Sequence, residues 1–204
     1  KNITDNFILY YSNVNVETVT EQKMLNAVNN SVDSCAIFLR VSNDYSVGGF
    51  AGVTVSDNIS QGTTAAIKIS GVLDVDKVVV TDNLFYNFID GVTLENTNAA
   101  GQDVYRITGN TFYGISNIVV NFSMKGGDVQ SVDLSNNVCK ECKTFAAVTS
   151  ILSTYKSTMI SNNFFESSLP NASFLDLTSN VFDTYTGIYD NTTRVVTTGL
   201  LNNL

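Results

Sequence analysis

The 204-residue chain contains no histidine, no tryptophan and only one proline. The absence of imidazole excludes histidine-based acid–base catalysis, the Ser-His and Cys-His nucleophile pairs, and every zinc site that needs a histidine ligand. Charged residues make up only 15% of the chain, whereas serine, threonine and asparagine are abundant. We therefore expect the fold to depend on packing and backbone pairing rather than on networks of charges.

Positive charge is scarce. Eleven Lys and Arg residues stand against 19 Asp and Glu residues, which gives a net charge of −8. An acidic chain does not attract a phosphate backbone or an anionic lipid surface, so we expect no nucleic-acid partner. No apolar run approaches the roughly 18 residues of a membrane-spanning helix, and we expect no membrane insertion.

The three cysteines form an odd set that cannot pair completely within one chain: Cys35, Cys139 and Cys142. Cys139 and Cys142 have the spacing of a redox motif or of half a zinc site, but no second such pair follows. Because phenylalanine fills the position of Cys139 in other repeats of the chain, we interpret Cys139 as a small buried hydrophobic residue. For Cys142, a free thiol and pairing outside the chain both remain open.

A repeat runs through the whole chain, which we interpret as a single domain (1–204) or a segment of a longer protein. Six strong copies place a hydrophobic residue, then Ser or Thr, then any residue, before an asparagine, and two weaker copies fit the same register at Asn30 and Asn191. The marker asparagines are Asn6, Asn30, Asn58, Asn83, Asn110, Asn137, Asn163 and Asn191. Their spacing is about 26 residues, which is typical of a solenoid.

The residues around each marker alternate in character. The third residue before it is apolar, whereas the second is Ser or Thr in the six strong copies, which indicates a strand with one buried face. Further short apolar stretches follow two places, and then about nine to fourteen places, after the marker. Three strands per repeat predict an all-β, three-sided, right-handed parallel β-helix of about eight coils.

We expect each marker asparagine to occupy a corner between two strands. Asparagine tolerates the left-handed conformation that a sharp corner requires, and its amide can bond to the backbone of its own and neighbouring coils. Stacked at the coil repeat, the amides would form a ladder. A ligand-binding row of asparagines is the alternative interpretation.

The hydrophobe-Ser/Thr-x-Asn-x-Phe pattern resembles the coils of the right-handed parallel β-helix superfamily, the pectate-lyase-like proteins and phage tailspikes. The resemblance implies an extracellular or cell-surface protein and a choice among polysaccharide lyase, glycoside hydrolase, epimerase, adhesin and structural roles. The chain lacks the Asn-Thr-Asp, Asp-Asp and Gly-His-Gly motifs of the hydrolases. It also lacks the arginine-rich stretch of the lyases, because Arg40, Arg106 and Arg194 are far apart in sequence.

Two pairs of charged residues are weak candidates for chemistry. Arg106 and Asp133 occupy equivalent outward positions in adjacent coils, and so do Asp57 and Asp82. A cross-strand salt bridge explains the first pair and corner chemistry explains the second. A catalytic carboxylate site or a bridging calcium ion is the alternative, and we otherwise expect no cofactor and no metal.

Other surface positions suggest further contacts. A column of hydroxyl side chains could bind ice or glycans, although it also fits an ordinary solvent-facing strand: Thr4, Ser56, Thr81, Thr108, Ser135 and Ser161. Candidate acceptors for N-linked glycosylation are Asn2, Asn29, Asn121 and Asn171. Chance alone accounts for as many such tripeptides in a chain of this composition.

The leading functional hypothesis is a structural or adhesive protein, an assembly or fibre-forming subunit or a surface-exposed segment. Neither end of the repeat carries an obvious polar cap, so we expect the ends to contact a second copy or adjoining chain segments. A polysaccharide-active enzyme without histidine and a non-catalytic glycan-binding module are the alternatives.

Overall fold

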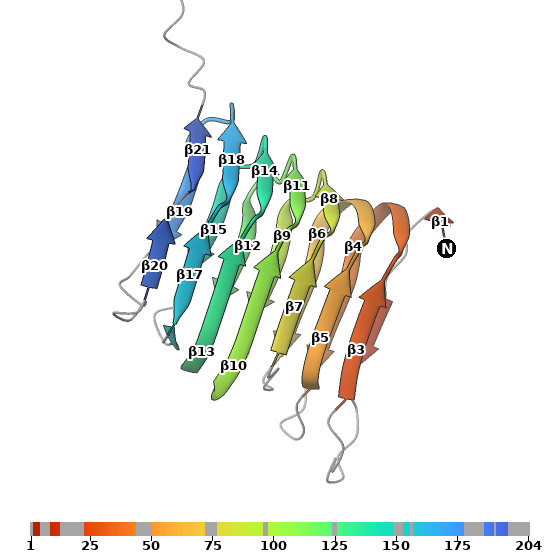
Figure 1. Ribbon diagram of the computed structural model, residues 1–204. Helices are drawn as coiled ribbons and strands as arrows, with labels where there is room; N and C mark the ends of the chain where they lie inside the picture. The colour runs from red at the N-terminus through yellow and green to blue at the C-terminus, as the bar shows by residue number, and fades with distance from the viewer. Residues whose placement is uncertain are drawn as a thin grey trace, which may run out of the picture.

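The computed structural model describes residues 2–4, 9–12, 23–43, 50–71, 77–95, 98–123, 126–148, 153–155, 157–177, 186–189 and 191–195. In this part of the chain the protein is a β-solenoid of parallel strands, and no helix is present. Figure 1 shows the strands of successive coils side by side along one axis, from β3 to β20. No helix capable of spanning a membrane occurs among the described residues.

One sheet contains eight strands. Its strands are β3 (Lys23–Val28), β5 (Phe50–Ser56), β7 (Lys77–Thr81), β10 (Asn98–Thr108), β13 (Gly126–Ser135), β16 (Ser153–Tyr155), β17 (Thr158–Ser161) and β20 (Thr186–Tyr189). All of these strands except β16 end two residues before a marker asparagine. The apolar residue three places before the marker pairs with its counterpart in the next coil, for example Val80 with Ile107 and Ile107 with Leu134.

The other sheet contains thirteen strands. They are β1 (Asn2–Thr4), β2 (Leu9–Ser12), β4 (Ser31–Asn43), β6 (Ile59–Gly71), β8 (Leu84–Tyr86), β9 (Asp90–Glu95), β11 (Thr111–Tyr113), β12 (Ile118–Ser123), β14 (Val138–Lys140), β15 (Thr144–Val148), β18 (Phe164–Ser167), β19 (Ser173–Leu177) and β21 (Thr192–Val195). The long strand β6 pairs with both β8 and β9, so one continuous strand matches two shorter strands of the next coil.

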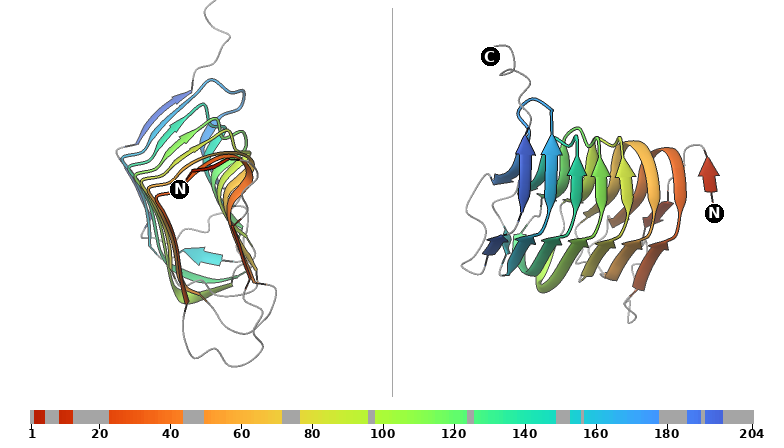
Figure 2. Two further views of the ribbon diagram at one scale, coloured as in Figure 1. Left: turned by 90° about the vertical axis from the view of Figure 1, so that its right-hand side faces the viewer. Right: turned by 45° about the horizontal axis from the view of Figure 1, so that its top comes forward.

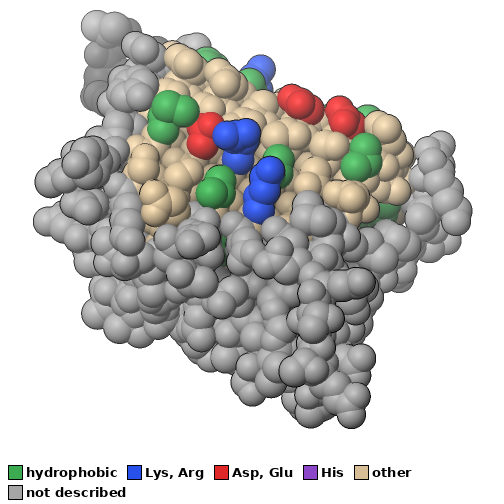
Figure 3. All heavy atoms as spheres, turned by 60° about the horizontal axis from the view of Figure 1, so that its bottom comes forward, with side chains coloured by type: hydrophobic (Ala, Val, Ile, Leu, Met, Phe, Trp, Pro, Cys, Tyr) green, Lys and Arg blue, Asp and Glu red, His purple; other side chains and the backbone are tan. Residues whose placement is uncertain are grey.

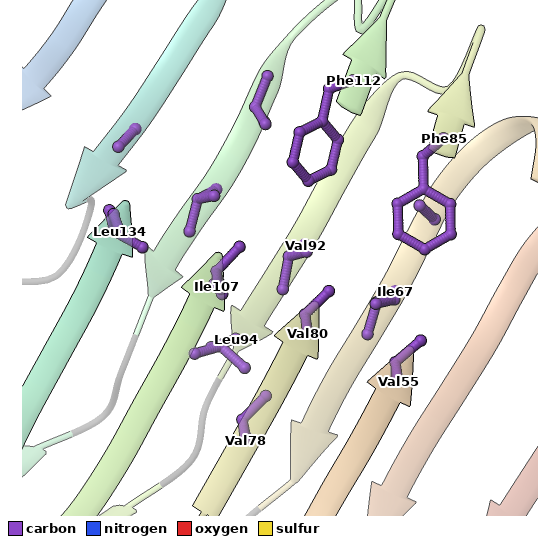
Figure 4. Packing of buried hydrophobic residues seen from close by; sticks show 14 of the residues in the cluster. Val55, Ile67, Val78, Val80, Phe85, Val92, Leu94, Ile107, Phe112 and Leu134 are labelled. Carbon is purple, nitrogen blue, oxygen red and sulfur yellow. The ribbon is translucent and has the colours of Figure 1, made fainter. Parts of the chain in front are cut away.

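The core lies between these sheets and consists of columns of inward side chains. Phe85 and Phe112 are fully buried, and their ring centroids are 5.9 Å apart, so aromatic packing continues from coil to coil. Figure 4 shows both rings above aliphatic residues such as Val80 and Ile107. Figure 2 shows the coils stacked behind one another, viewed nearly along the solenoid axis in its left panel. Parallel strands with a shared register thus bury the same repeat position in every coil.

We call the corner that contains the marker the first corner. At six described first corners the left-handed residue is not the marker itself, so the expectation from the sequence was wrong on this point. It is the preceding residue, with φ between 54° and 70°: Asn29, Asp57, Asp82, Gly109, Asn136 and Asn162. The reversal of direction falls one residue earlier because the marker must turn its amide inward to reach neighbouring backbone. Asp, Asn and Gly are the residues that tolerate this conformation best.

A second corner follows four residues after the marker. Its left-handed residues are Ser34, Asn87, Gly114 and Glu141, which share no side-chain chemistry. The backbone N–H groups of Asn87, Gly114 and Glu141 bond to the next coil. That of Gly114, for example, donates to the carbonyl oxygen of Lys140 at 2.9 Å. This corner joins strands such as β8 and β9, whose separation the sequence pattern implies, but the pattern did not locate its left-handed residue.

Candidate functional site at the asparagine corner

Seven marker asparagines form one hydrogen-bonded column along the solenoid. The Nδ2 group of each donates to the Oδ1 atom of the next, at 2.9 to 3.1 Å. The members are Asn30, Asn58, Asn83, Asn110, Asn137, Asn163 and Asn191. The eighth marker, Asn6, lies outside the described residues. The column therefore links every pair of successive coils from residue 30 to residue 191.

Each amide in the middle of the column is used completely. The Nδ2 group of Asn110 also donates to the carbonyl oxygens of Val80 and Thr108, at 2.8 and 3.1 Å. Its Oδ1 atom accepts from the backbone N–H and the Nδ2 group of Asn83. Asn110 is fully buried. An amide with all its donors and acceptors engaged has nothing left for a ligand, so the column does not fit a ligand-binding row.

Beside the column, the outer surface is hollowed over three coils. A shallow depression of about 420 Å³ is lined by Asp57, Asn58, Ile59, Asp82, Asn83, Leu84, Gly109 and Thr111. Asp57 and Asp82 are exposed at its edge, because both occupy the left-handed position where the side chain points away from the core. Ile59 is 47% exposed and provides an apolar surface next to the two carboxylates. The depression combines negative charge with an apolar floor.

An outward, mostly apolar column continues from the depression along the short strands. Its members pair in register and are partly or fully exposed: Ile59, Leu84, Thr111, Val138 and Phe164. Two residues further on, Tyr86 pairs with Tyr113, which is 49% exposed. Sequence reasoning missed this surface, although the apolar residue directly after most markers was a visible signal for it.

The other weak candidate pair lies elsewhere. Arg106 and Asp133 are cross-strand partners in β10 and β13, with 3.7 Å between Nε and Oδ2. The side chains are 55% and 22% exposed, and neither residue lines the depression. Asp133 Oδ1 is buried without a hydrogen-bond partner. The geometry is that of a partly exposed surface ion pair, which stabilises little.

The hydroxyl column is less accessible than a binding surface would require. Ser56, Thr81 and Thr108 are half-buried, whereas Ser135 and Ser161 are buried. The side chain of Thr4 lies outside the described part. Among the described residues on the face drawn in Figure 3, charged side chains of both signs lie among polar and apolar ones, without a large patch of one sign.

All three cysteines are buried, and none forms a disulfide. Cys139 fills the inward position that Phe85 and Phe112 occupy in neighbouring coils. The pairing of Cys142 with another chain does not fit its complete burial. Within the described residues, no three Asp, Glu, Cys or His side chains come close enough to hold a metal ion.

Comparison with known proteins gives no relative: no family model, no curated protein and no solved structure matches this chain.

Proposed function

We propose that the protein is a non-enzymatic structural or adhesive solenoid that acts outside the cell or at its surface. The observation that carries the proposal is the asparagine column, which ties successive coils together through buried, fully used amides. Such a column makes a stiff rod with an outer surface that repeats at each coil. Rigidity and a repeating surface are what a fibre subunit or an adhesive stalk requires.

The candidate chemical groups support this proposal rather than an enzyme. The guanidinium group of Arg106 is engaged by Asp133, which leaves it poorly placed as a base. The exposed carboxylates of Asp57 and Asp82 border a shallow depression instead of a closed cleft. A polysaccharide lyase, hydrolase or epimerase without histidine is therefore the weaker alternative.

Assembly in solution tests the proposal. Multi-angle light scattering and negative-stain electron microscopy across a range of concentrations should show rods that lengthen as the concentration rises. A polysaccharide panel, with and without calcium, should remain intact. Turnover of any polysaccharide that disappears in Arg106→Ala would overturn the structural role. The same scattering experiment also tests the partner. We propose that the partner is a second copy of this chain, and growth of the particle mass with concentration would show it.

A second candidate function is glycan binding without turnover, which the depression favours. An apolar floor with carboxylates beside it and two tyrosines on the same outward face can stack against a sugar ring and accept hydrogen bonds from its hydroxyl groups. Isothermal titration against neutral oligosaccharides should show binding that is lost in Tyr113→Ala. Unchanged affinity in that variant, or no binding at all, would remove this candidate.

The finer architecture and the glycosylation sites are also proposals. We infer eight coils with three sides each and a right-handed path, like the pectate-lyase-like superfamily; a high-resolution experimental structure would test these features.

Of the candidate acceptors for N-linked glycosylation, Asn29 and Asn171 are exposed, Asn121 is half-buried, and the side chain of Asn2 lies outside the described residues. In a secreted protein, glycopeptide mapping should therefore find sugar at Asn29 and Asn171 first. No cofactor is proposed, and calcium at Asp57 and Asp82 would be detected by titration.

A further inference from the structure

In several coils the second corner has two inward side chains close together in sequence. The residues two and five places after the marker face each other across this corner, and their side chains are buried in all of the following pairs: Val32 and Cys35, Phe85 and Phe88, Phe112 and Ile115, and Cys139 and Cys142. The rings of Phe85 and Phe88 have centroids 6.4 Å apart in an edge-to-face arrangement. The corner therefore positions this pair of residues for direct contact.

Only one of these described pairs consists of two thiols. Cys139 lies on β14 and Cys142 follows the left-handed residue Glu141, so the corner turns both sulfur atoms into the core. Cys142 Sγ lies 3.3 Å from the carbonyl oxygen of Lys140 and 3.6 Å from that of Phe112, so it is held against the short strands of the inner face. The corner thus places both thiols in the core, three residues apart, where Phe85 and Phe88 contact each other in another coil.

We propose that Cys139 and Cys142 are a redox-modification site, a dithiol that a small dialkyl disulfide oxidises to a disulfide bond across the second corner. The thiolate of Cys142 attacks one sulfur of the oxidant, whose S–S bond breaks, and the leaving thiolate takes up a proton. Cys139 loses its proton and attacks the sulfur of Cys142, which releases the second thiol of the oxidant. Two thiols are thereby oxidised, and one external disulfide is reduced to two thiols.

The surroundings of the two sulfur atoms support this order of events. The hydrogen bond from Cys139 lowers the pKa of the Cys142 thiol, whereas burial raises the pKa of Cys139 well above its ordinary value. Cys142 therefore forms a thiolate at lower pH than an ordinary cysteine and is the first nucleophile. Glu141 and Lys143, its chain neighbours, are half-buried and exposed, so a local opening of the corner admits a small oxidant.

Cys35 provides a control within the same chain. It occupies the position of Cys142 in an earlier coil, but its partner across the corner is Val32. Its Sγ atom lies 3.4 Å from the hydroxyl oxygen of Ser60, and burial raises the pKa of its thiol. Cys35 is thus in an equivalent corner without a second thiol and should stay reduced.

Peptide mapping tests the proposal on the folded, full-length chain. The protein is incubated with hydroxyethyl disulfide, denatured, alkylated and digested with trypsin, which cuts after Lys140 between the two cysteines. A disulfide joins peptide 126–140 to peptide 141–143, and the intact protein loses about two mass units. Cys35 should be recovered alkylated in its own peptide. The midpoint of thermal unfolding should be higher in the oxidised than in the reduced protein.

The outcomes are distinct. Alkylation of both Cys139 and Cys142 after oxidation would overturn the proposal, as would a persistent mixed disulfide or a link that involves Cys35. Cys35→Ser should retain the linked peptides and the shift in the unfolding midpoint, whereas Cys142→Ser should lose both. If Cys142→Ser does not fold, mapping of the unmodified sequence decides alone.

Discussion

The two corners of the coil solve the same geometric problem with different chemistry. Both turn the chain through a left-handed residue whose N–H group bonds to the next coil, as at Asp82 and Asn87. The first corner adds a buried amide that must be an asparagine, whereas the second adds an apolar contact that phenylalanine, isoleucine or cysteine can provide. Hydrogen bonding in register requires one residue type, but packing requires only volume and an apolar surface.

The largest expected effect comes from the second corner, where packing is the main contribution. Phe112→Ala removes a fully buried ring that contacts Phe85, and the cavity should reduce the free energy of unfolding by about 4 kcal/mol. Urea denaturation followed by circular dichroism measures the change. Tyr113→Ala, next to it but exposed on the outer face, is the control and should have a much smaller effect. Equal losses in the two variants would show that the inward column is not the core.

The next largest effect is at the first corner. Asn110→Ala removes the amide that serves the carbonyl oxygens of Val80 and Thr108, and buried groups are left unpaired. We expect a loss of about 3 kcal/mol in the free energy of unfolding. Asn110→Asp keeps the shape of the side chain but removes its donors, and it should be about as damaging. Asn87 is an exposed residue of the second corner, and Asn87→Asp should change the free energy of unfolding by less than about 0.5 kcal/mol.

Substitution of the two glycines that are left-handed among the described residues compares the corners directly. Gly109 and Gly114 have φ values of 70° and 67°, so valine at either position should cost about 2 kcal/mol in strain. Asparagine should be nearly neutral at both, because Asp57, Asn87 and Asn136 already adopt this conformation in other coils. A Cβ atom at Gly109 would contact Asp82 Oδ1, but that side chain is exposed and can rotate. Thermal unfolding of the four variants provides the comparison. If asparagine lowers the unfolding midpoint at one corner only, the two corners do not have equivalent backbone conformations.

The smallest effect is expected away from both corners, on the face of the eight-stranded sheet. Arg106→Ala breaks a partly exposed ion pair and should cost about 0.5 kcal/mol, an effect that decreases at high salt. Denaturation at low and high ionic strength measures it. A loss comparable with that of Asn110→Ala would mean that the face, rather than the corner, holds neighbouring coils together.

The difference between the corners also explains what the sequence could predict. The repeat, the parallel solenoid and the inward positions of Val80, Ile107 and Leu134 follow from alternation around a residue that cannot vary. The turning residue of the second corner could not be located, because the residues at that position share only a backbone conformation and no residue type: Ser34, Asn87, Gly114 and Glu141. Paired glycines in a sequence suggest a turn, and we would place one at Gly126 and Gly127 from the sequence alone. Both residues instead belong to strand β13, because the neighbouring strand β10 supplies their pairing.

The surface depression was only half predictable. Asp57 and Asp82 were visible as acidic residues at equivalent positions of adjacent coils, and the structure places both at the edge of the depression. Its apolar floor, which includes Ile59 and Leu84, depends on which face of a short strand points outward. Arg106 and Asp133 were found by the same reasoning but lie on a different face. Equivalent positions in successive repeats predict which residues are neighbours along the solenoid axis. They do not predict which residues of different strands lie on the same face of the coil.

The asparagine column gives the solenoid a polarity. From Asn30 to Asn163, each Nδ2 group donates one hydrogen bond to the Oδ1 atom of the following coil, so all side-chain carbonyl oxygens of the column face the same end of the axis. The Nδ2 groups also donate to backbone carbonyl oxygens, as Asn110 does to Val80 of the preceding coil, but no Oδ1 atom of the column points the other way. Aligned amide dipoles reinforce one another, and the two directions along the rod are chemically unequal. Copies that continue the column can therefore join only head to tail, because a head-to-head contact sets carbonyl against carbonyl. Head-to-tail association closes only if the rotation between copies forms a ring. Copies that add along a straight axis would instead form a polar filament and not a symmetric dimer.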